Sequence, residues 1–408
     1  MAAPAAPTCC LLHSPQLLEI SNRNPKFVGR SLLVQGLIEA YKLTEALRII
    51  APQAASKADL HSFHAASYLD CLATANEYVS SDEIADDYLT EELEQHGIAY
   101  DCPLFKGVYD YCSLVGGASI TAAKCLLQKE ATVAINWYGG WHHAGRDEAG
   151  GHCYCNDIVL AILKLEEGFQ RILYIDLDLH HGDAVENAFS FSRNVMTVSF
   201  HKYEAGFYPG TGSVDKVGEG RGSFYSVNVP LNDGIRDQPF TELFARVMAE
   251  IKDKFEPEVV VVQCGADGLH GDPMQSFNLT IQGLGNCVAF ILNWQLPTLL
   301  LGGGGYNFPN TARCWAYLTS IAVKRMLPND IPEHQWFSQY GPDYTLHCPP
   351  GNKPDKNNVK YMAELVNTIS GNLSHLSEWL LRTERLQELT SVNKVISTLS
   401  AKCDIYKK

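Results

Sequence analysis

Short runs rich in Val, Ile and Leu recur along this chain, and they constrain its fold more than any other feature. They span residues 132–137, 171–177, 195–200, 224–229, 258–264 and 297–301. Most are continuously apolar, which is typical of strands that are buried on both faces of a parallel sheet. Helix-like segments lie between or before them, at residues 32–47, 117–128, 157–166, 238–254, 280–294 and 311–326. The alternation predicts a three-layer α/β/α sandwich with a central, mainly parallel sheet.

The chain of 408 residues suits one large domain of this kind, because 46% of its residues are hydrophobic and 19% are charged. We expect a single domain over residues 1–375 and a helical extension over residues 376–408. The acidic segment 80–94 predicts an exposed loop with a short helix, and residues 349–358 predict a polar surface segment. Residues 361–369 and 376–398 have amphipathic patterns, which fit helices packed on the domain or, as the alternative, a partner-binding helix.

The charge and cysteine content bound the class of protein. With 46 acidic and 32 basic residues, the net charge is -14, which disfavours direct nucleic-acid binding and favours basic partners such as Lys-rich peptides. Several of the 13 cysteines lie in apolar stretches and no CxxC pair occurs, so we expect free thiols in a reducing compartment. The N-terminus has no basic region followed by an apolar run, and no segment approaches the roughly 20 apolar residues of a membrane span. We therefore expect a soluble intracellular protein.

A cluster of polar residues, DLDLHHGD at 176–183, directly follows one predicted strand. Alternate residues of an extended segment face the same side, so Asp176, Asp178 and His180 can converge. Ligands of open parallel sheets bind at the carboxyl ends of the strands. Unpaired carboxylates are costly to bury unless they bind a metal or accept hydrogen bonds, so a merely capped strand end is the weaker interpretation.

A second carboxylate, Asp267, follows the strand at 258–264 in the sequence GAD. A lone aspartate there would be an ordinary helix cap. Together with Asp178 and His180, however, it completes two carboxylates and one imidazole, a set that suits catalytic zinc with one position left open for water. The sequence thus predicts a metal centre at these three residues.

Two further clusters follow strands. GGWHHA at residues 139–144 places His142 and His143 after a glycine turn, and Asp176 and Asp183 could each orient one imidazole. On its own, a His-His pair would be read as two surface residues. GGGGY at residues 302–306 lets the backbone approach a ligand closely, and the Tyr306 hydroxyl could donate to an oxyanion. A phosphate site is disfavoured because neither GxGxxG nor a following Lys-Ser/Thr occurs.

Taken together, GGWHHA, DLDLHHGD, GAD and GGGGY resemble the motifs of the histone deacetylase family in order and spacing, over about residues 10–375. YDCP at residues 100–103 and GDPM at residues 271–274 are similar to the histone deacetylase 8 branch of class I. The resemblance implies an arginase/deacetylase-like fold and hydrolysis of N6-acetyl-lysine, or a longer acyl-lysine, in histones and other proteins. It also implies a nuclear and cytoplasmic location, acetylated lysine peptides as partners, and inhibition by hydroxamates.

The resemblance also implies individual roles. Asp178, His180 and Asp267 would bind zinc, with ferrous iron as the alternative in cells. His142 and His143, with Asp176 and Asp183, would be catalytic together with Tyr306. Asp101 would grip the substrate backbone at the rim, and Arg30 would guard an internal channel. The acyl-lysine tunnel would be lined by Gly151, His152, Tyr208 and Met274.

Structural potassium or sodium ions would have ligands in two sets. The first is Asp176, Asp178, His180, Ser199 and Phe200, and the second is Phe189, Ser192, Val195 and Tyr225. Two tunnel positions depart from the family, because His152 and Tyr208 stand where Phe is usual. His152 makes the tunnel more polar and adds a group that titrates near neutral pH, so altered acyl-chain or inhibitor preference and a shifted pH optimum are expected.

The expected chemistry is metal-assisted amide hydrolysis, with His143 as general base and then general acid. Three alternatives stay open from the sequence. An acetylpolyamine deacetylase would use the same residues on a small molecule, although a peptide-gripping Asp101 and GDPM favour a protein substrate. An arginase-like ureohydrolase would need two manganese ions. A catalytically inactive scaffold is the third, although every catalytic position is filled.

Overall fold

The computed structural model describes residues 9–78 and 87–376. Its centre is an eight-stranded sheet in the order β2-β1-β3-β8-β7-β4-β5-β6, and every strand pair is parallel. The strands are β1 (Cys9–Leu12), β2 (Arg48–Ile50), β3 (Val133–Asn136), β4 (Ile172–Asp176), β5 (Val195–Lys202), β6 (Ser226–Leu231), β7 (Val259–Gln263) and β8 (Thr298–Leu301). The predicted α/β architecture with a parallel sheet is confirmed.

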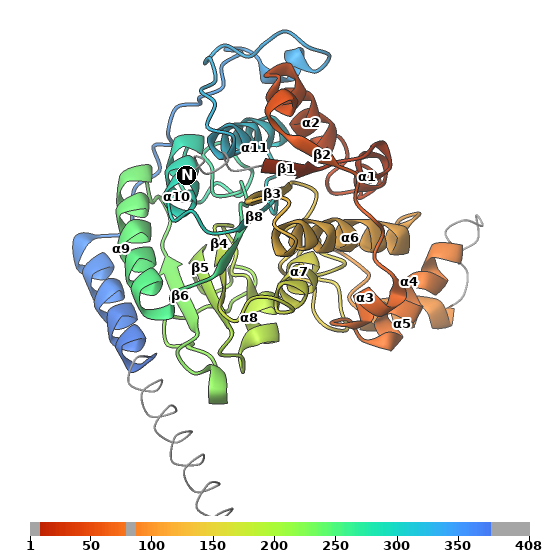
Figure 1. Cartoon of the computed structure of the whole chain (residues 1–408), viewed down its shortest axis with the longest axis horizontal. Helices are drawn as coiled ribbons and strands as arrows, with labels where there is room; N and C mark the ends of the chain where they lie inside the picture. Colours follow the sequence, from red (N-terminus) through yellow and green to blue (C-terminus); the bar gives the residue numbers. More distant parts are fainter. Residues whose placement is uncertain (1–8, 79–86, 377–408) are drawn as a thin grey trace, which may run out of the picture.

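Helices cover both faces of the sheet (Figure 1). On one face are α1 (Pro15–Ser21), α3 (Lys57–His61), α4 (Ala66–Tyr78), α5 (Asp87–Gln95), α6 (Val108–Leu127), α7 (Asp157–Leu165) and α8 (Asp183–Phe189). On the other are α2 (Arg30–Ala40), α9 (Asp237–Phe255), α10 (Ile281–Leu292) and α11 (Phe308–Ala322). Three short 3-10 helices, η1 (Leu43–Ala46), η2 (Gly220–Gly222) and η3 (Phe337–Tyr340), are also present.

Most strands contribute side chains to both hydrophobic cores; the exceptions are β6, which contributes to one core, and the edge strand β2, which has no buried residue. In β4, Ile172 and Tyr174 belong to the core under α6 and α7, whereas Leu173 and Ile175 belong to the core under α9 to α11. All five residues of β4 are buried. Burying one such apolar side chain stabilises the fold by about 1.5–3 kcal/mol, so a strand of this kind is stable only between two helical layers. The continuous apolar runs of the sequence therefore follow directly from the three-layer arrangement.

Some predicted boundaries were wrong. The segment predicted as one helix over residues 32–47 ends at Ala40, because Lys42 has a left-handed backbone (φ 56°) and a 3-10 turn follows. The helix predicted to begin at residue 117 begins earlier, at Val108, and Gly117 lies inside it. A β-carbon at position 117 would collide with the backbone of residues 53–55, so this glycine serves close packing and does not end the helix. Strands β1 and β2 were not predicted; β1 has four residues, and β2 has three, two of which are exposed.

The polypeptide after the sheet returns to the core as a helix over residues 359–376. Its apolar residues Leu365, Val366, Ile369, Leu373 and Leu376 are buried in the same core as α9 to α11. The segment predicted at 361–369 is therefore a helix packed on the domain. The predicted extension after residue 376 lies outside the described residues. Among those that are described, no helix combines the length and apolar character that crossing a membrane requires.

Candidate metal centre and active site

Four adjacent strands in the middle of the sheet carry the four polar clusters. Their order is β3-β8-β7-β4, and their carboxyl ends lead into GGWHHA, GGGGY, GAD and DLDLHHGD, respectively. Because parallel strands end at the same edge of the sheet, clusters that are far apart in the sequence lie side by side there. One cavity at this edge is lined by residues from three of the clusters, including His142, His143, Asp178, His180 and Tyr306, and Asp267 of the fourth cluster lies next to Asp178 and His180.

Asp178 and His180 line this cavity, and Asp267 comes together with them. Their candidate ligand atoms all lie within 4.8 Å of one another, and all three residues are buried. His180 Nδ1 lies 3.2 Å from Asp178 Oδ1 and 2.9 Å from Asp267 Oδ2. The predicted convergence of these three residues is thus present in the structure.

The electrostatics of the triad fit a cation. Burial, together with the nearby charge of Asp178, raises the pKa of Asp267 to about 7. Burial lowers the pKa of His180, but hydrogen bonds to Asp178 and Asp267 outweigh this effect and raise it to about 10. Two buried carboxylates that face one imidazole therefore require a positive charge between them. A divalent metal ion supplies that charge, and its ligand set would be two oxygens and one nitrogen.

Glycines allow the backbone to pass close to this triad. Gly304 N donates to Asp178 Oδ2 over 2.8 Å, and a β-carbon at position 304 would lie 2.5 Å from Asp267 Oδ2. Any larger residue would displace a ligand carboxylate. The GGGGY turn is therefore glycine-rich because it wraps the metal centre.

The two histidines of GGWHHA each have their own carboxylate. His142 Nδ1 donates to Asp176 Oδ2 over 2.7 Å, and His143 Nδ1 donates to Asp183 Oδ1 over 2.7 Å. The two rings lie 4.0 Å apart between their centroids. Since each Nδ1 faces its aspartate, each Nε2 is left to face the cavity. These pairings are the ones predicted from the sequence.

The two imidazoles differ strongly in basicity. Burial lowers the pKa of His142, but the charges of Asp176 and Asp178 outweigh this and raise it to about 9. For His143, burial and the neighbouring His142 lower the pKa to about 4, against the opposing effect of Asp183. At neutral pH one ring is therefore charged and the other is neutral, so the neutral ring of His143 can accept a proton.

Tyr306 lines the same cavity as the two histidines. Its ring lies against Phe27 (5.8 Å between centroids) and His152 (5.7 Å). Arg30 lies behind it, buried, and its Nη1 donates to the carbonyls of Gly303 and Gly305. Arg30 therefore holds the turn that carries Tyr306, in addition to the channel role expected of it.

Of the residues expected to form the tunnel and rim, Gly151 lines the cavity, and the others have the following contacts. Asp101 Oδ2 accepts from Gly151 N over 2.8 Å, and His152 Nδ1 donates to the Asp101 carbonyl over 2.6 Å. The Tyr208 ring is partly exposed and lies edge-on to His143, 4.9 Å away. Met274 packs at the edge of the core, and its N–H donates to Asp272. Asp101 is thus joined directly to the tunnel wall.

The expected ligands of monovalent cations fall into two places. Ser199 pairs with Asp176 across β5 and β4, and Phe200 follows it, so the first set lies beside the metal centre. The second set lies at the start of β5, where Phe189 O accepts from Ser192 N and Tyr225 O accepts from Thr197 N. Most expected ligands are backbone carbonyls, which no side-chain pattern reveals.

Several buried polar residues that hold the site in place were missed from the sequence. Gln263 Nε2 donates to Asp178 Oδ2 and Gly140 O. Asp157 accepts from the N–H groups of Gly140 and Trp141, and Asp272 accepts from those of Tyr306 and Asn307. A polar residue at the end of an apolar strand could have indicated Gln263. The partners of Asp157 and Asp272 depend on the fold and had no local signal.

The contact of one aromatic residue, Phe207, with the site was also not predicted from the sequence. Phe207 is stacked on the His180 imidazole, with 5.1 Å between centroids and 5° between planes. It shields one face of a metal-binding ring from solvent. Its neighbour Tyr208 was selected on resemblance alone, and nothing in the local sequence distinguished the role of Phe207 from that of an ordinary loop aromatic.

Comparison with known proteins agrees with this geometry. The model of the histone deacetylase domain matches residues 25–322. Histone deacetylase 8 of Xenopus tropicalis is 49% identical over 366 residues, covering 90% of this chain and 97% of that protein. Histone deacetylase 8 of Danio rerio is 49% identical over 365 residues, covering 90% and 95%. Histone deacetylase 1 of Homo sapiens is 40% identical over 353 residues, covering 86% and 72%. The chain therefore belongs to the histone deacetylase family of metal-dependent amidohydrolases.

Proposed function

We propose that this enzyme hydrolyses the amide of N6-acetyl-lysine, or of a longer acyl-lysine, in histones and other proteins, and that its metal is zinc. The observation that carries the proposal is a buried Asp178/His180/Asp267 triad, two members of which, Asp178 and His180, line one cavity with a neutral imidazole, His143, and with the hydroxyl-bearing Tyr306. An amide hydrolase needs a metal site, a base and an oxyanion donor around one carbonyl. These three parts surround the same space.

Each side chain has a defined task in this proposal. A metal bound by the triad supplies a Lewis acid and lowers the pKa of a bound water. His143 takes a proton from the attacking water and delivers it to the leaving lysine amine, while Asp183 keeps its Nδ1 protonated. His142, charged and paired with Asp176, stabilises negative charge that develops on the substrate. Tyr306 donates its hydroxyl to the former carbonyl oxygen.

The donor set supports zinc but allows ferrous iron. Two carboxylates and one imidazole occur with zinc in catalytic sites, and oxygen and nitrogen donors discriminate poorly between the two metals. We further propose that potassium or sodium ions bind at the two sets of carbonyls beside β4 and β5. Such ions would fix the backbone that carries Asp176 and Asp178, and thereby the metal ligands.

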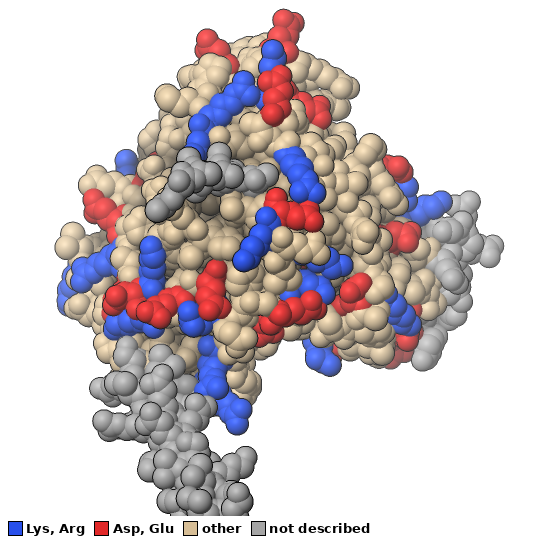
Figure 2. Space-filling view, in the orientation of Figure 1, with Lys and Arg blue, Asp and Glu red and all other residues tan. Residues whose placement is uncertain are grey.

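The tunnel would admit an acyl-lysine side chain between Gly151, His152, Tyr208 and Met274, with Asp101 gripping the peptide backbone at the rim. Hydroxamates, which combine a metal-binding group with a narrow chain, are expected to compete with it. Figure 2 shows acidic and basic side chains interspersed on one face of the molecule, which gives a peptide several places of either sign to bind. We propose action on proteins in the nucleus and cytoplasm, without direct nucleic-acid binding or membrane attachment.

We propose residues 1–375 as one catalytic domain and residues 376–408 as an extension. The helix over residues 359–376 supports this boundary, because its apolar side chains are part of the main core. Removing that helix should therefore destabilise the enzyme, whereas removal of residues after 376 should leave catalysis intact.

The test is hydrolysis of an acetyl-lysine peptide by the purified chain, compared with N-acetylspermidine. Activity on the peptide that a chelator abolishes, that zinc restores and that a hydroxamate inhibits is the expected result. Turnover of acetylspermidine in preference to the peptide would identify a small-molecule deacetylase instead. A folded, metal-loaded chain without activity on any acyl peptide would refute the proposal.

A further inference from the structure

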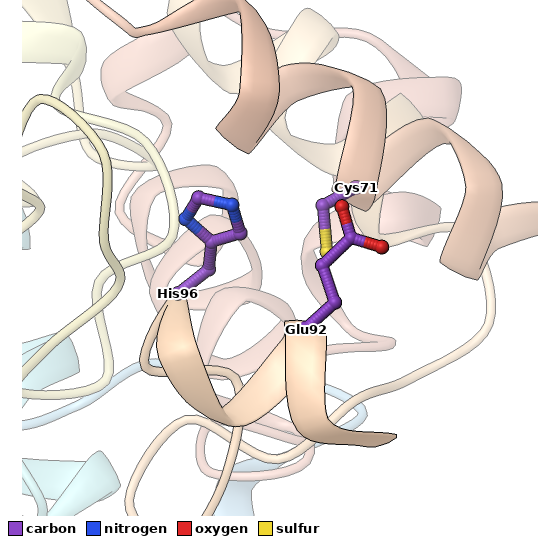
Figure 3. A group of neighbouring side chains, drawn as sticks. All are labelled: Cys71, Glu92 and His96. Carbon is purple, nitrogen blue, oxygen red and sulfur yellow. The ribbon is translucent and has the colours of Figure 1, made fainter. Parts of the chain in front are cut away.

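A second group of candidate metal ligands lies outside the active site, between α4 and α5. Cys71 is on α4, Glu92 is on α5, and His96 directly follows α5. One donor atom from each lies within 4.8 Å of those of the other two. Within residues 9–78 and 87–376, the catalytic triad is the other group that meets this spacing. Figure 3 shows the three side chains approaching one another from the two helices.

The local structure explains why these residues meet. Glu92 and His96 are four residues apart at the end of a helix, so they lie on the same side. Cys71 is 1% exposed and comes from the opposite helix. Glu92 and His96 are half-buried. A metal ion between them would be shielded on the protein side and accessible to water on the other.

The orientation of His96 is an independent indication of a ligand. Its Nδ1 lies 2.5 Å from the carbonyl oxygen of Asp147, so Nδ1–H donates and the lone pair is on Nε2. Figure 3 shows one ring nitrogen on the side of Glu92 and Cys71, and Nε2 is the one left for that side. A backbone carbonyl that fixes the far nitrogen of an imidazole is the usual partner of a metal-binding histidine. Tyr68 supports the ring from the side, 5.5 Å away.

We propose that Cys71, Glu92 and His96 bind one transition-metal ion of the zinc class, separately from the catalytic centre. A thiolate, an imidazole and a carboxylate suit zinc, whereas magnesium and calcium prefer oxygen alone. Donor atoms around tetrahedral zinc are about 3.5 Å apart, and the donor atoms here already lie within 4.8 Å of one another, so binding needs only a small closure of the side chains. Three protein donors leave the fourth position to water, which makes the ion exchangeable.

The site is connected to the active-site rim through the backbone. Besides the bond from His96 Nδ1 to Asp147, Ala149 N donates to His96 O over 2.9 Å. Gly151 and His152 of the tunnel wall follow directly. A metal ion there would tie α4 to α5 and stiffen the segment from which the tunnel wall starts.

Cobalt(II) distinguishes the two sites because their donors differ. The catalytic triad offers oxygen and nitrogen only, whereas the second site offers a sulfur. The full-length chain, freed of metal and loaded with cobalt, should show a thiolate-to-cobalt charge-transfer band. Cys71→Ala should abolish that band and lower the bound cobalt from about two ions per chain to about one. His96→Gln, at a half-buried position, should weaken the band without depending on the packing of Cys71.

Controls separate this site from other thiols. Glu91→Gln changes an exposed charge on α5 outside the group and should leave the band unchanged. Asp267→Asn should remove the catalytic ion and retain the band. Absence of the band in the parent chain would overturn the proposal. Persistence of the band in Cys71→Ala would also overturn it, because the band would then come from another thiol, such as Cys153 of the active-site cavity. A band that His96→Gln leaves unchanged would overturn it as well.

Discussion

Replacing Tyr306 by Phe removes one hydroxyl from the active site and leaves the surrounding structure in place. The ring contacts with Phe27 and His152 involve the aromatic face, which Phe retains. The backbone N–H at position 306 still donates to Asp272 Oδ2 over 2.7 Å. Folding and metal binding should therefore stay within the range of the parent enzyme. The lost interaction is the hydrogen bond that strengthens as negative charge develops on the substrate carbonyl oxygen.

The expected cost is about 2.7–4 kcal/mol of transition-state stabilisation, or a loss of about a hundred- to a thousandfold in kcat. KM should change little, because the neutral carbonyl of the ground state accepts only a weak hydrogen bond. The assay is steady-state hydrolysis of an acetyl-lysine peptide, with metal content and melting temperature measured on the same preparation. A variant with intact metal and folding whose kcat stays within about threefold of the parent would refute the assigned role.

Three further changes test other parts of the structure. Asp267→Asn keeps an oxygen that accepts from the N–H of Leu179 but removes a negative charge from the triad. The metal content after dialysis should therefore fall while the fold persists. Retention of the full metal complement would contradict the assignment of Asp267 as a ligand. His152→Phe removes the hydrogen bond to the Asp101 carbonyl, which should cost about 0.5–1.5 kcal/mol of stability. It also makes the tunnel less polar, so kcat/KM for longer acyl peptides should rise relative to kcat/KM for acetyl peptides. An unchanged ratio would show that His152 does not select the acyl chain. Asp233→Asn should cost about 1–3 kcal/mol near neutral pH. Burial raises the pKa of Asp233, but hydrogen bonds from lysine side chains outweigh this effect and lower the pKa well below its ordinary value. The stabilisation by Asp233 is therefore complete above about pH 5 and is lost as the pH falls further. Chemical denaturation across that range should show the parent approaching the variant in acid, and parallel pH curves would contradict the linkage.

The architecture was predictable because the central strands are buried on both faces, which gives each of them a continuous apolar sequence. β4, β7 and β8 contribute to both cores, so each appears in the sequence as a continuous apolar run. β1 and β2 were not recognised, and Gly117 gives the signal of a helix end although it lies within α6. Prediction from the local sequence fails where a residue's role depends on a contact with a residue that is distant in the sequence.

The active-site residues were predictable for a similar reason. Asp178, His180, Asp267, His142 and His143 stand directly after apolar strands, where polar residues are costly without a function. The residues that hold these side chains in place could not be predicted. Their hydrogen-bond partners lie in other parts of the chain, as those of Asp157, Gln263 and Asp272 do. Such partners can be identified only in the folded structure.

The types of element, the buried pattern of the strands and the chemical groups at their ends could be predicted from the sequence, since they depend on neighbours a few residues away. The strand order β3-β8-β7-β4, which places four distant clusters at one edge, became known only from the folded structure. The folded structure also sets which histidine is neutral, because the pKa difference between His142 and His143 arises from burial and from the distances to surrounding charges. The meeting of Cys71 with Glu92 and His96 has the same origin. Each depends on how separate segments pack, and the local pattern of the chain does not encode that packing directly.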